Sequence, residues 1–501
     1  MKPSQTKLVL LVTVGVLACA TARPAHAFII DSDPNYEPWL TTASGSRSGN
    51  GDPVTLTWSI VPDGTNVPSS DFGNLGSSDL ISFLDTNFGA GPGGIDLTQR
   101  PWFHFFTDSF GRWSELSSAT YVYEPNDDGA AHITANGLLG VRGDLRIAGA
   151  GIDGVSNTLA FNYFPDDGDM VLDTDDGEFF SDSANNHRAL RNTIMHEHGH
   201  GFGLYHVNSN TDNLLLELAI DNSFDGPQLD EVRAIQYHFG DANEKSNGGL
   251  GNDSAALATS LGAIVPDEAI SVGSDADVPD QFILPTATDF VSIANLGDTD
   301  FYSFSVSQPS DLNVVLTPRG GQFTQAQDGF TPTFFDASAR SDLALAIFDL
   351  DGTSLLGSAD KTEKGGIESL VDLSLPAAGE YFVRITGGDD TIQLYELELS
   401  ISSPVIFLAA DFDMDGDVDN TDLATWQAAF GLSAAGDTDD DGDSDGADFL
   451  TWQQQFTGDL GAVAVLTTTV PEPATALLLL TGMLKLAFPR RKRHEPLARP
   501  V

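Results

Sequence analysis

The chain has 501 residues, of which 41% are hydrophobic, so it is long enough for several domains with real cores. Its 23 Lys and Arg residues stand against 73 Asp and Glu residues, which gives a formal net charge of -50. A chain this acidic repels nucleic acids and anionic membrane surfaces, which argues against either as a partner. Two causes of the acidity compete: a solubility or high-salt adaptation of the surface, and carboxylates clustered for calcium.

Residues 1–27 have the pattern of a secretory signal peptide. Lys2 and Lys7 precede an apolar run over residues 8–20, and residues 25–27 read AHA, which fits a cleavage site. The only cysteine, Cys19, lies in this segment, so we expect a mature chain without disulfides or thiols. An alternative makes residues 16–19 a lipobox in which Cys19 is lipidated.

Residues 28–242 are predicted to form one mixed α/β domain. Val54, Leu56, Trp58 and Ile60 alternate with polar residues, as in a strand. Further elements are expected as a strand over residues 159–165 and as helices over residues 101–116, 185–200 and 228–240.

Residues 196–206 read HEHGHGFGLYH and fit H-E-x-x-H-x-x-G-x-x-H. On a helix, His196 and His200 lie one above the other and reach one metal ion. Gly203 allows a sharp turn, after which His206 can return as third ligand, and the fourth position stays open for water as catalytic zinc requires. Glu197 can take a proton from that water and pass it to the leaving amine. The alternatives are adventitious metal binding and a zinc site kept for stability.

The motif and its surroundings, over residues 50–241, resemble the matrixin branch of the metzincin zinc peptidases. Residues 159–165 (LAFNYFP) resemble the strand that lines the substrate cleft, residues 168–176 (GDMVLDTDD) the metal-rich segment, and residues 228–240 the C-terminal helix. The resemblance implies an α+β metzincin-like catalytic domain with one zinc ion. It also implies calcium ligands, against the alternative of a solvated acidic loop: Asp153, Asp173 and Asp176 at one site, and Asp144 and Asp169 at another.

The chain departs from the family in three respects. The histidines of the family's structural zinc site would fall at Asn162 and Val171, so we expect no structural zinc. Leu216 stands where the methionine turn carries its methionine, and it keeps an apolar floor of similar volume below the zinc. Because the mature chain has no cysteine, it also lacks the cysteine switch that holds matrixins latent.

Residues 243–253 are rich in Gly and Asn and are predicted to be a linker. Residues 254–402 show short alternating strands between turns, which favours a β-sandwich accessory domain. The phrases DTDFYSFSV, LAIFD, PAAGEYFVRITG and YELELSI resemble the bacterial pre-peptidase C-terminal domain, which implies a module without catalytic residues.

Residues 405–460 contain a repeat, in which residues 411–430 recur 26 positions later as residues 437–456. The acidic residues have the spacing of EF-hand calcium loops, with Asp in place of the usual Glu at position 12. The pair resembles a type I dockerin, a small α domain, which implies a cohesin-like scaffold as partner; a calcium-rigidified stalk or a flexible acidic spacer are the alternatives. The predicted calcium ligands are Asp411, Asp413, Asp415, Asp419 and Asp422, then Asp437, Asp439, Asp441, Asp445 and Asp448.

Residues 470–493 combine a VPEP motif, an apolar run and the basic stretch RRKR. They resemble the PEP-CTERM sorting signal, which implies export, a short transmembrane span and removal of the tail by a sorting enzyme; an ordinary membrane anchor is the alternative. The sequence as a whole predicts a multidomain, secreted or surface-displayed zinc endopeptidase that acts on proteins or peptides. The alternative from another class is a non-catalytic, calcium-dependent adhesion or matrix protein on a metzincin scaffold.

Overall fold

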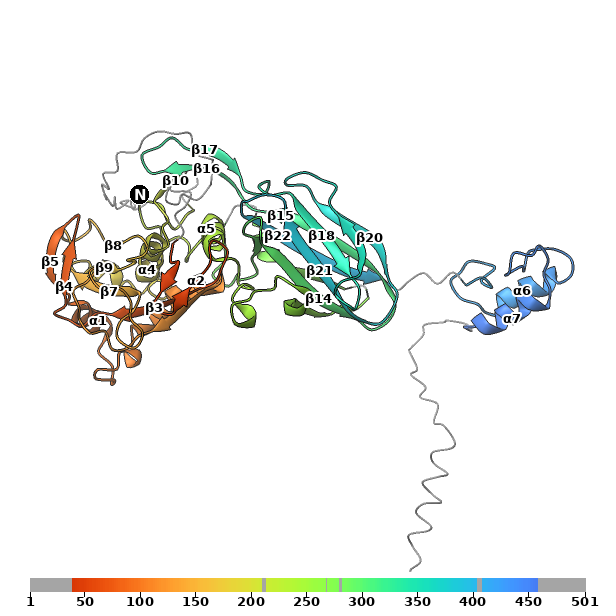
Figure 1. The fold of residues 1–501 in the computed structure, drawn as a ribbon, viewed down its shortest axis with the longest axis horizontal. Helices are drawn as coiled ribbons and strands as arrows, with labels where there is room; N and C mark the ends of the chain where they lie inside the picture. Colours follow the sequence, from red (N-terminus) through yellow and green to blue (C-terminus); the bar gives the residue numbers. More distant parts are fainter. Residues whose placement is uncertain (1–37, 210–212, 267, 279–281, 403–407, 458–501) are drawn as a thin grey trace, which may run out of the picture. The chain divides into compact units, whose positions relative to one another are not determined.

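The computed structural model describes residues 38–209, 213–266, 268–278, 282–402 and 408–457 (Figure 1). The chain divides into two compact units, Met1–Pro404 and Val405–Val501. The predicted signal peptide and sorting segment lie outside the described residues. Among the residues that are described, no helix has both the length and the hydropathy needed to cross a membrane.

A five-stranded sheet carries the N-terminal domain of the first unit, with the strand order β6-β3-β7-β9-β8. The strands β3, β6, β7 and β9 are parallel to their neighbours, whereas β8 at the edge is antiparallel to β9. The expected strands around Val54–Ile60 and Ala160–Asn162 are both present. The bounds are β3 (Val54–Ile60), β6 (Ala119–Tyr123), β7 (Leu145–Ala150), β8 (Ala160–Asn162) and β9 (Met170–Asp173).

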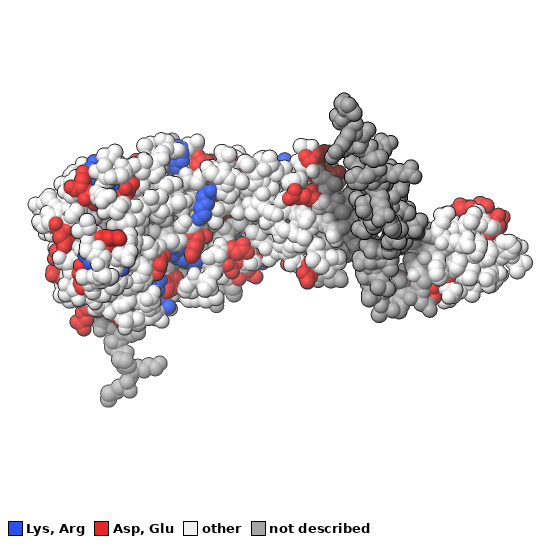
Figure 2. Space-filling view, turned by 90° about the horizontal axis from the view of Figure 1, so that it is seen from below, with Lys and Arg blue, Asp and Glu red and all other residues white. Residues whose placement is uncertain are grey.

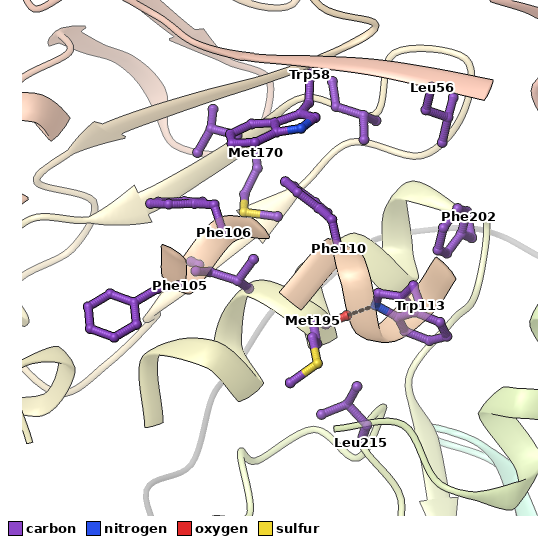
Figure 3. Close-up of a cluster of buried hydrophobic side chains, with 14 of the residues drawn as sticks. Leu56, Trp58, Phe105, Phe106, Phe110, Trp113, Met170, Met195, Phe202 and Leu215 are labelled. Atoms are coloured by element: carbon purple, nitrogen blue, oxygen red, sulfur yellow. Dashed lines mark hydrogen bonds between the residues drawn. The ribbon is translucent and has the colours of Figure 1, made fainter. Parts of the chain in front are cut away.

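Three predicted helices are present near their expected places, and two of them, α2 and α4, pack against this sheet. Apolar rings from α2 pack on one face of the sheet, where Trp58 stacks on Phe103 with ring centroids 5.4 Å apart. Trp113 Nε1 donates a hydrogen bond of 3.3 Å to Met195 O, which ties α2 to α4 (Figure 3). Such aromatic pairs add about 0.5–1.5 kcal/mol beyond their burial, so this core fixes α4 firmly. The helices are α1 (Leu80–Phe88), α2 (Phe103–Glu115), α3 (Gly177–Phe180), α4 (Arg188–Gly201) and α5 (Leu229–Phe239), and short pieces are β1 (Thr41–Thr42), β2 (Gly45–Ser46), β4 (Asn66–Ser69), β5 (Gly73–Ser77) and η1 (Leu97–Gln99).

Two five-stranded sheets follow and enclose one apolar core, which is the expected β-sandwich. Their strands alternate between buried and more exposed side chains, most regularly in β15. The first sheet has the order β11 (Thr259–Ala263), β14 (Thr299–Val306), β21 (Gly379–Gly387), β18 (Leu343–Phe348), β19 (Leu355–Ala359). The second has β12 (Ala269–Val272), β22 (Gln393–Ser402), β15 (Ser310–Arg319), β20 (Glu368–Leu375), with β13 (Val291–Ile293) also on β22.

One hairpin of the sandwich domain, β16 (Gln322–Gln327) and β17 (Thr333–Asp336), leaves the two sheets. It pairs instead with β10 (Val207–Ser209) of the N-terminal domain (Figure 1). The residues expected to form a linker are also packed, since Glu244 and Asn252 are buried. The two domains therefore share one compact unit. The short turns η2 (Ser246–Gly248) and η3 (Ala255–Leu257) lie between α5 and β11, and a third, η4 (Ser274–Ala276), follows β12 within the sandwich domain.

The second unit consists of two loop-helix repeats, with the helices α6 (Asn420–Ala429) and α7 (Gly446–Gln455). Each helix begins with a capping box, formed by Asp419 and Asp422 in the first and by Asp445 and Asp448 in the second. The repeats meet through aromatic rings, with Trp426 stacked on Phe449 at 4.7 Å.

Acidic side chains are spread over the face shown in Figure 2 rather than gathered in one patch, and basic ones are few. The negative charge is therefore distributed over this face, and some further carboxylates form the clusters described below.

Candidate metal centre

Helix α4 and the turn after it bring three histidines together. His196 and His200 are one helical turn apart, with ring centroids separated by 5.0 Å. The helix ends at Gly201, and Gly203 has a φ of 89°, which side chains other than glycine rarely adopt. Gly203 N donates to His200 O at 2.8 Å, and this tight turn leads His206 back toward the helix.

The three imidazoles present the same atom to one point. His206 Nε2 lies 3.1 Å from Nε2 of both His196 and His200. The Nδ1 atoms of His196 and His200 donate to Leu215 O and Leu204 O, each at 2.6 Å, which leaves the Nε2 lone pairs free. Lone pairs this close repel each other unless a cation lies among them. Zinc at about 2.0–2.1 Å from each nitrogen would separate tetrahedral ligands by about 3.3 Å, so the donor set fits zinc.

Burial keeps these histidines in the form that binds metal. It lowers the pKa of His196 to about 3 and that of His200 to about 4. It also lowers the pKa of His206 well below the usual value, and the other two histidines add to this shift. Neutral imidazole is the ligand form, so no protons need to be removed at neutral pH.

Glu197 directly follows the first ligand in sequence and is 3% exposed. Burial raises the pKa of its carboxyl to about 8. A carboxyl in this position can take up and release a proton, as a general base must. Its place on α4, between His196 and His200, puts it on the helix that supplies two of the ligands.

His198, the remaining histidine of the motif, lies in the aromatic core instead. Tyr121 Oη and His198 Nε2 are 2.7 Å apart, and the ring centroid of Phe202 lies 4.1 Å from that of His198. His198 Nε2 therefore has a protein partner in the aromatic core and is not one of the three nitrogens that converge.

The segment next to the histidines is apolar, with Leu216 at the position of the family's methionine. A Cβ placed on Gly199 would lie 2.9 Å from Leu216 Cδ2, so Leu216 packs directly against α4. Leu216 N donates to Glu231 Oε1 at 3.2 Å, and Val207 N donates to Leu216 O at 2.9 Å. The floor is therefore tied both to α5 and to the chain that leaves His206.

The strand predicted to line a substrate cleft, β8, is the edge strand on this side of the sheet. A Cβ on Gly201 would lie 3.0 Å from Asn162 Nδ2, so α4 runs close against β8. Phe164, just after β8, has its ring centroid 5.9 Å from that of His200. The chain just after the edge strand thus lies beside His200.

The first predicted calcium site of this domain has its carboxylates in adjoining loops. Asp176 Oδ1 accepts from Ser156 N at 2.8 Å, and Asp153 Oδ2 accepts from Thr158 Oγ1 at 2.7 Å. The other oxygens of Asp173 and Asp176 are buried without hydrogen-bond partners. Burial above all raises the pKa of Asp173 to about 6, and the charge of Asp176 adds to the shift. Unpaired buried oxygens are what a calcium site requires, and calcium here remains a prediction.

The second predicted pair holds separate parts of the fold together. Asp144 accepts from Ala43 N at 2.7 Å and from both Thr57 N and Thr57 Oγ1. Asp169 accepts from Ile133 N and Arg146 N at 2.8 and 2.9 Å. These bonds give both carboxylates a structural role, and a shared calcium ion stays an untested prediction.

The two positions where structural zinc would need histidines have other surroundings. Val171 lies in a small apolar cluster with Val61, Val67 and Ala148. Asn162 Nδ2 donates to Tyr163 O at 2.7 Å. Neither side chain offers the imidazole nitrogen that the family's structural zinc takes, so the expectation of no structural zinc stays a prediction from these residues.

The C-terminal loops bring some of the predicted calcium ligands together, and calcium binding stays a prediction. Each loop has a glycine with a positive φ at position 6, Gly416 at 98° and Gly442 at 97°. Asp419 and Asp445 accept from backbone amides of their own helices. Oxygen atoms that could hold a metal ion lie within 4.8 Å of one another in the groups Asp411, Asp413, Asp422 and Asp437, Asp439, Asp448.

One group of carboxylates was not expected from the sequence. Oxygens of Glu244, Asp253 and Asp298 lie within 4.8 Å of one another where the N-terminal domain meets the sandwich. Burial raises the pKa of Glu244 to about 9 and that of Asp298 to about 7, and neighbouring carboxylates add to both shifts. Of the three, Glu244 is buried, Asp298 is half-buried and Asp253 is exposed, and carboxylates this close repel unless they are protonated or neutralised. Asp298 is distant in sequence from the other two, so no spacing in the sequence marks the group.

Comparison with known families identifies two of the domains. Residues 94–240 match the family model for Matrixin, and residues 298–387 match that for the bacterial pre-peptidase C-terminal domain. The chain therefore contains a matrixin domain followed by a pre-peptidase C-terminal domain, as the two resemblances imply.

Two solved structures are similar to part of the chain. The pre-peptidase C-terminal domain of collagenase from Bacillus anthracis is 11% identical, with 29% of this chain and 94% of that chain covered at a TM-score of 0.16. The Aeromonas hydrophila protein PliG, a periplasmic inhibitor of g-type lysozyme, is also 11% identical, with 29% and 98% covered at a TM-score of 0.16. No curated protein matches the chain.

Proposed function

We propose that the chain is an exported zinc endopeptidase that cleaves peptide bonds in extended segments of protein substrates. One observation carries the proposal: three neutral imidazoles converge through Nε2, and a buried carboxyl lies on the same helix as two of them. The matrixin match of residues 94–240 supports the same chemistry, because that family implies catalytic zinc.

The histidines and Glu197 have separate roles in the proposed hydrolysis. His196, His200 and His206 hold the ion, and the Nδ1 hydrogen bonds of the first two fix their rings. When bound, zinc supplies a Lewis acid that polarises the scissile carbonyl and lowers the pKa of water. Glu197 takes the proton of the attacking water and then donates it to the leaving amine.

The edge strand β8 supplies the binding site for the substrate main chain. An extended peptide can add to β8 as a further strand, which gives affinity through main-chain hydrogen bonds. Because the chain just after β8 lies beside His200, such a strand brings a peptide carbonyl to the metal centre. Side-chain preference then depends on pockets along the strand.

The accessory parts suggest display outside the cell. A pre-peptidase C-terminal domain is found in secreted bacterial proteases, which supports export. We infer that the two C-terminal loops bind calcium and act as a dockerin-like module for a cohesin-like scaffold, or as a rigid stalk. The predicted signal peptide and PEP-CTERM segment would deliver the protein to the surface.

The test compares the wild-type full chain with Glu197→Gln, which keeps the shape of the side chain and removes its base. Casein cleavage and bound zinc are measured for both, and the exposed Glu380→Gln serves as control. We expect cleavage by wild type and control, its loss on chelation, and a mutant that binds zinc but is at least about a hundredfold slower. Zinc binding by all three without cleavage of any peptide library would favour the adhesion protein on a metzincin scaffold.

A further inference from the structure

The third zinc ligand differs from the other two in how its backbone is held. His196 and His200 belong to α4, whereas His206 lies beyond the end of the helix at Gly201. Two main-chain hydrogen bonds fix the chain at this point. Val207 N donates to Leu216 O at 2.9 Å, and Asp328 N donates to His206 O at 3.2 Å. The second donor belongs to the sandwich domain.

The hydrogen bond from Asp328 N continues the regular pairing between strands β10 and β16. Strand β10 pairs antiparallel with β16, with Val207 opposite Gln327 and Ser209 opposite Gln325. The same register places Asp328 opposite His206, so the ligand is the next residue of this two-domain sheet. Any shift of the hairpin β16–β17 along β10 would therefore move the backbone of His206.

Contacts with helix α5 hold the hairpin β16–β17 in a defined position, so that it can fix the position of His206. Phe323 and Phe335 are buried in an apolar cluster with Leu229 and Val232, residues of α5. Gln325 Nε2 donates to the buried Asp230 Oδ2 at 2.5 Å. Apolar and polar contacts thus hold β16 on the helix that also supports the floor of the metal centre.

We propose that the hairpin β16–β17 is a positioning element of the metal centre, and that the amide of Asp328 sets the place of His206. The catalytic unit then extends from the matrixin domain into the sandwich domain. This inference rests on the proposed function only in treating the three histidines as zinc ligands. Groups that orient a ligand from outside change metal affinity by about 10–100-fold when removed.

The test uses two substitutions at one residue in the full chain. Asp328→Pro removes the amide donor, whereas Asp328→Ala removes only the side chain and keeps the donor. Zinc affinity is measured by competition with a chromogenic chelator, together with the unfolding midpoint of each zinc-free protein. We expect zinc binding to weaken about tenfold in Asp328→Pro and to remain unchanged in Asp328→Ala. Equal affinities in the two folded variants would overturn the proposal.

A second measurement covers the case in which Asp328→Pro does not fold. Coupling is reciprocal, so a hairpin that strengthens zinc binding must itself be stabilised by zinc. Amide hydrogen exchange of β16 in the wild-type chain should slow when zinc is added, whereas that of β20 should not change. An exchange rate in β16 that stays the same when zinc is added would contradict the proposal. If only the peptidase proposal fails, the result is different. Zinc still binds and its affinity still depends on the hairpin β16–β17, but no peptide is cleaved.

Discussion

Leu216 packs directly against Gly199, at a distance that leaves no room for a side chain on the helix at that point. The contact closes the floor of the metal centre. It also shows how a leucine can replace a methionine there, since the two side chains have similar volume.

We therefore expect Leu216→Met to cost less than about 1.5 kcal/mol and to leave zinc binding unchanged. Leu216→Ala should cost about 2–5 kcal/mol, because it opens a cavity beside α4. Urea unfolding of the zinc-free protein, with zinc affinity alongside, measures both effects. An alanine variant as stable as the methionine variant would show that the floor is not tightly packed.

Tyr121 gives a test of the aromatic core around α4. Its hydroxyl is the partner of His198 Nε2 at 2.7 Å, and His198 is buried. Tyr121→Phe should cost about 1–3 kcal/mol, because a buried nitrogen loses its partner. Zinc affinity should not change, since His198 takes no part in the cluster of the three ligands. A loss of zinc without a loss of stability would mean that His198 belongs to the metal centre.

The buried carboxylates between the two domains predict a dependence of stability on pH. The pKa values in the fold, about 9 for Glu244, about 7 for Asp298 and about 6 for Asp241, lie above those of an unfolded chain, chiefly because burial disfavours the charged form. Their stabilisation is therefore complete below about pH 4 and is lost as the pH rises through the folded values.

With a metal chelator present, the free energy of unfolding of the first unit should fall by a few kcal/mol as the pH is raised from about 5 to about 9. The chelator prevents divalent cations from neutralising the charges. Glu244→Gln should make the decline shallower, and the exposed Glu380→Gln should not. Stability that stays level in the chelator would show that these carboxylates are already ionised in the fold.

The C-terminal loops predict two calcium ions for the second unit. Asp411→Asn weakens the first loop and should reduce the stoichiometry by one, because a calcium ion needs several charged oxygens. Asp443→Asn is the matched control, since position 7 of such a loop contributes its backbone carbonyl rather than its side chain. Titration calorimetry of the full chain, with zinc saturating the other centre, counts the ions. The same number of bound calcium ions in Asp411→Asn as in the wild type would support the acidic-spacer alternative.

Local patterns in the sequence predicted much of the fold. The apolar periodicity of residues 101–116, the glycines after His200 and the spacing of the three histidines each act within a few residues. Such short-range patterns are enough to predict α2, α4 and the convergence of the three imidazoles. The matrixin and pre-peptidase C-terminal resemblances are supported by their family matches. The dockerin-like and PEP-CTERM assignments rest on sequence alone.

Contacts between distant segments could not be predicted in the same way. The strand β10 has only three residues, and nothing in them specifies pairing with β16. Glycines in residues 243–253 suggested a linker, yet Glu244 and Asn252 are buried, and Glu244 lies close to the distant Asp298. Long-range pairing depends on the complete tertiary structure, which the local pattern of a sequence does not specify.

The bond between Gln325 and Asp230 joins residues 95 positions apart, and the strand that carries Gln325 is the later of the two to be synthesised. A nascent chain that has emerged only as far as α5 would lack every atom of this partner strand. The backbone of His206 would gain its bond from Asp328 N only after β16 had been made and had paired with β10. If the proposed peptidase activity and the proposed role of the hairpin both hold, the zinc affinity of the nascent chain would rise only when this later strand has been made and has paired.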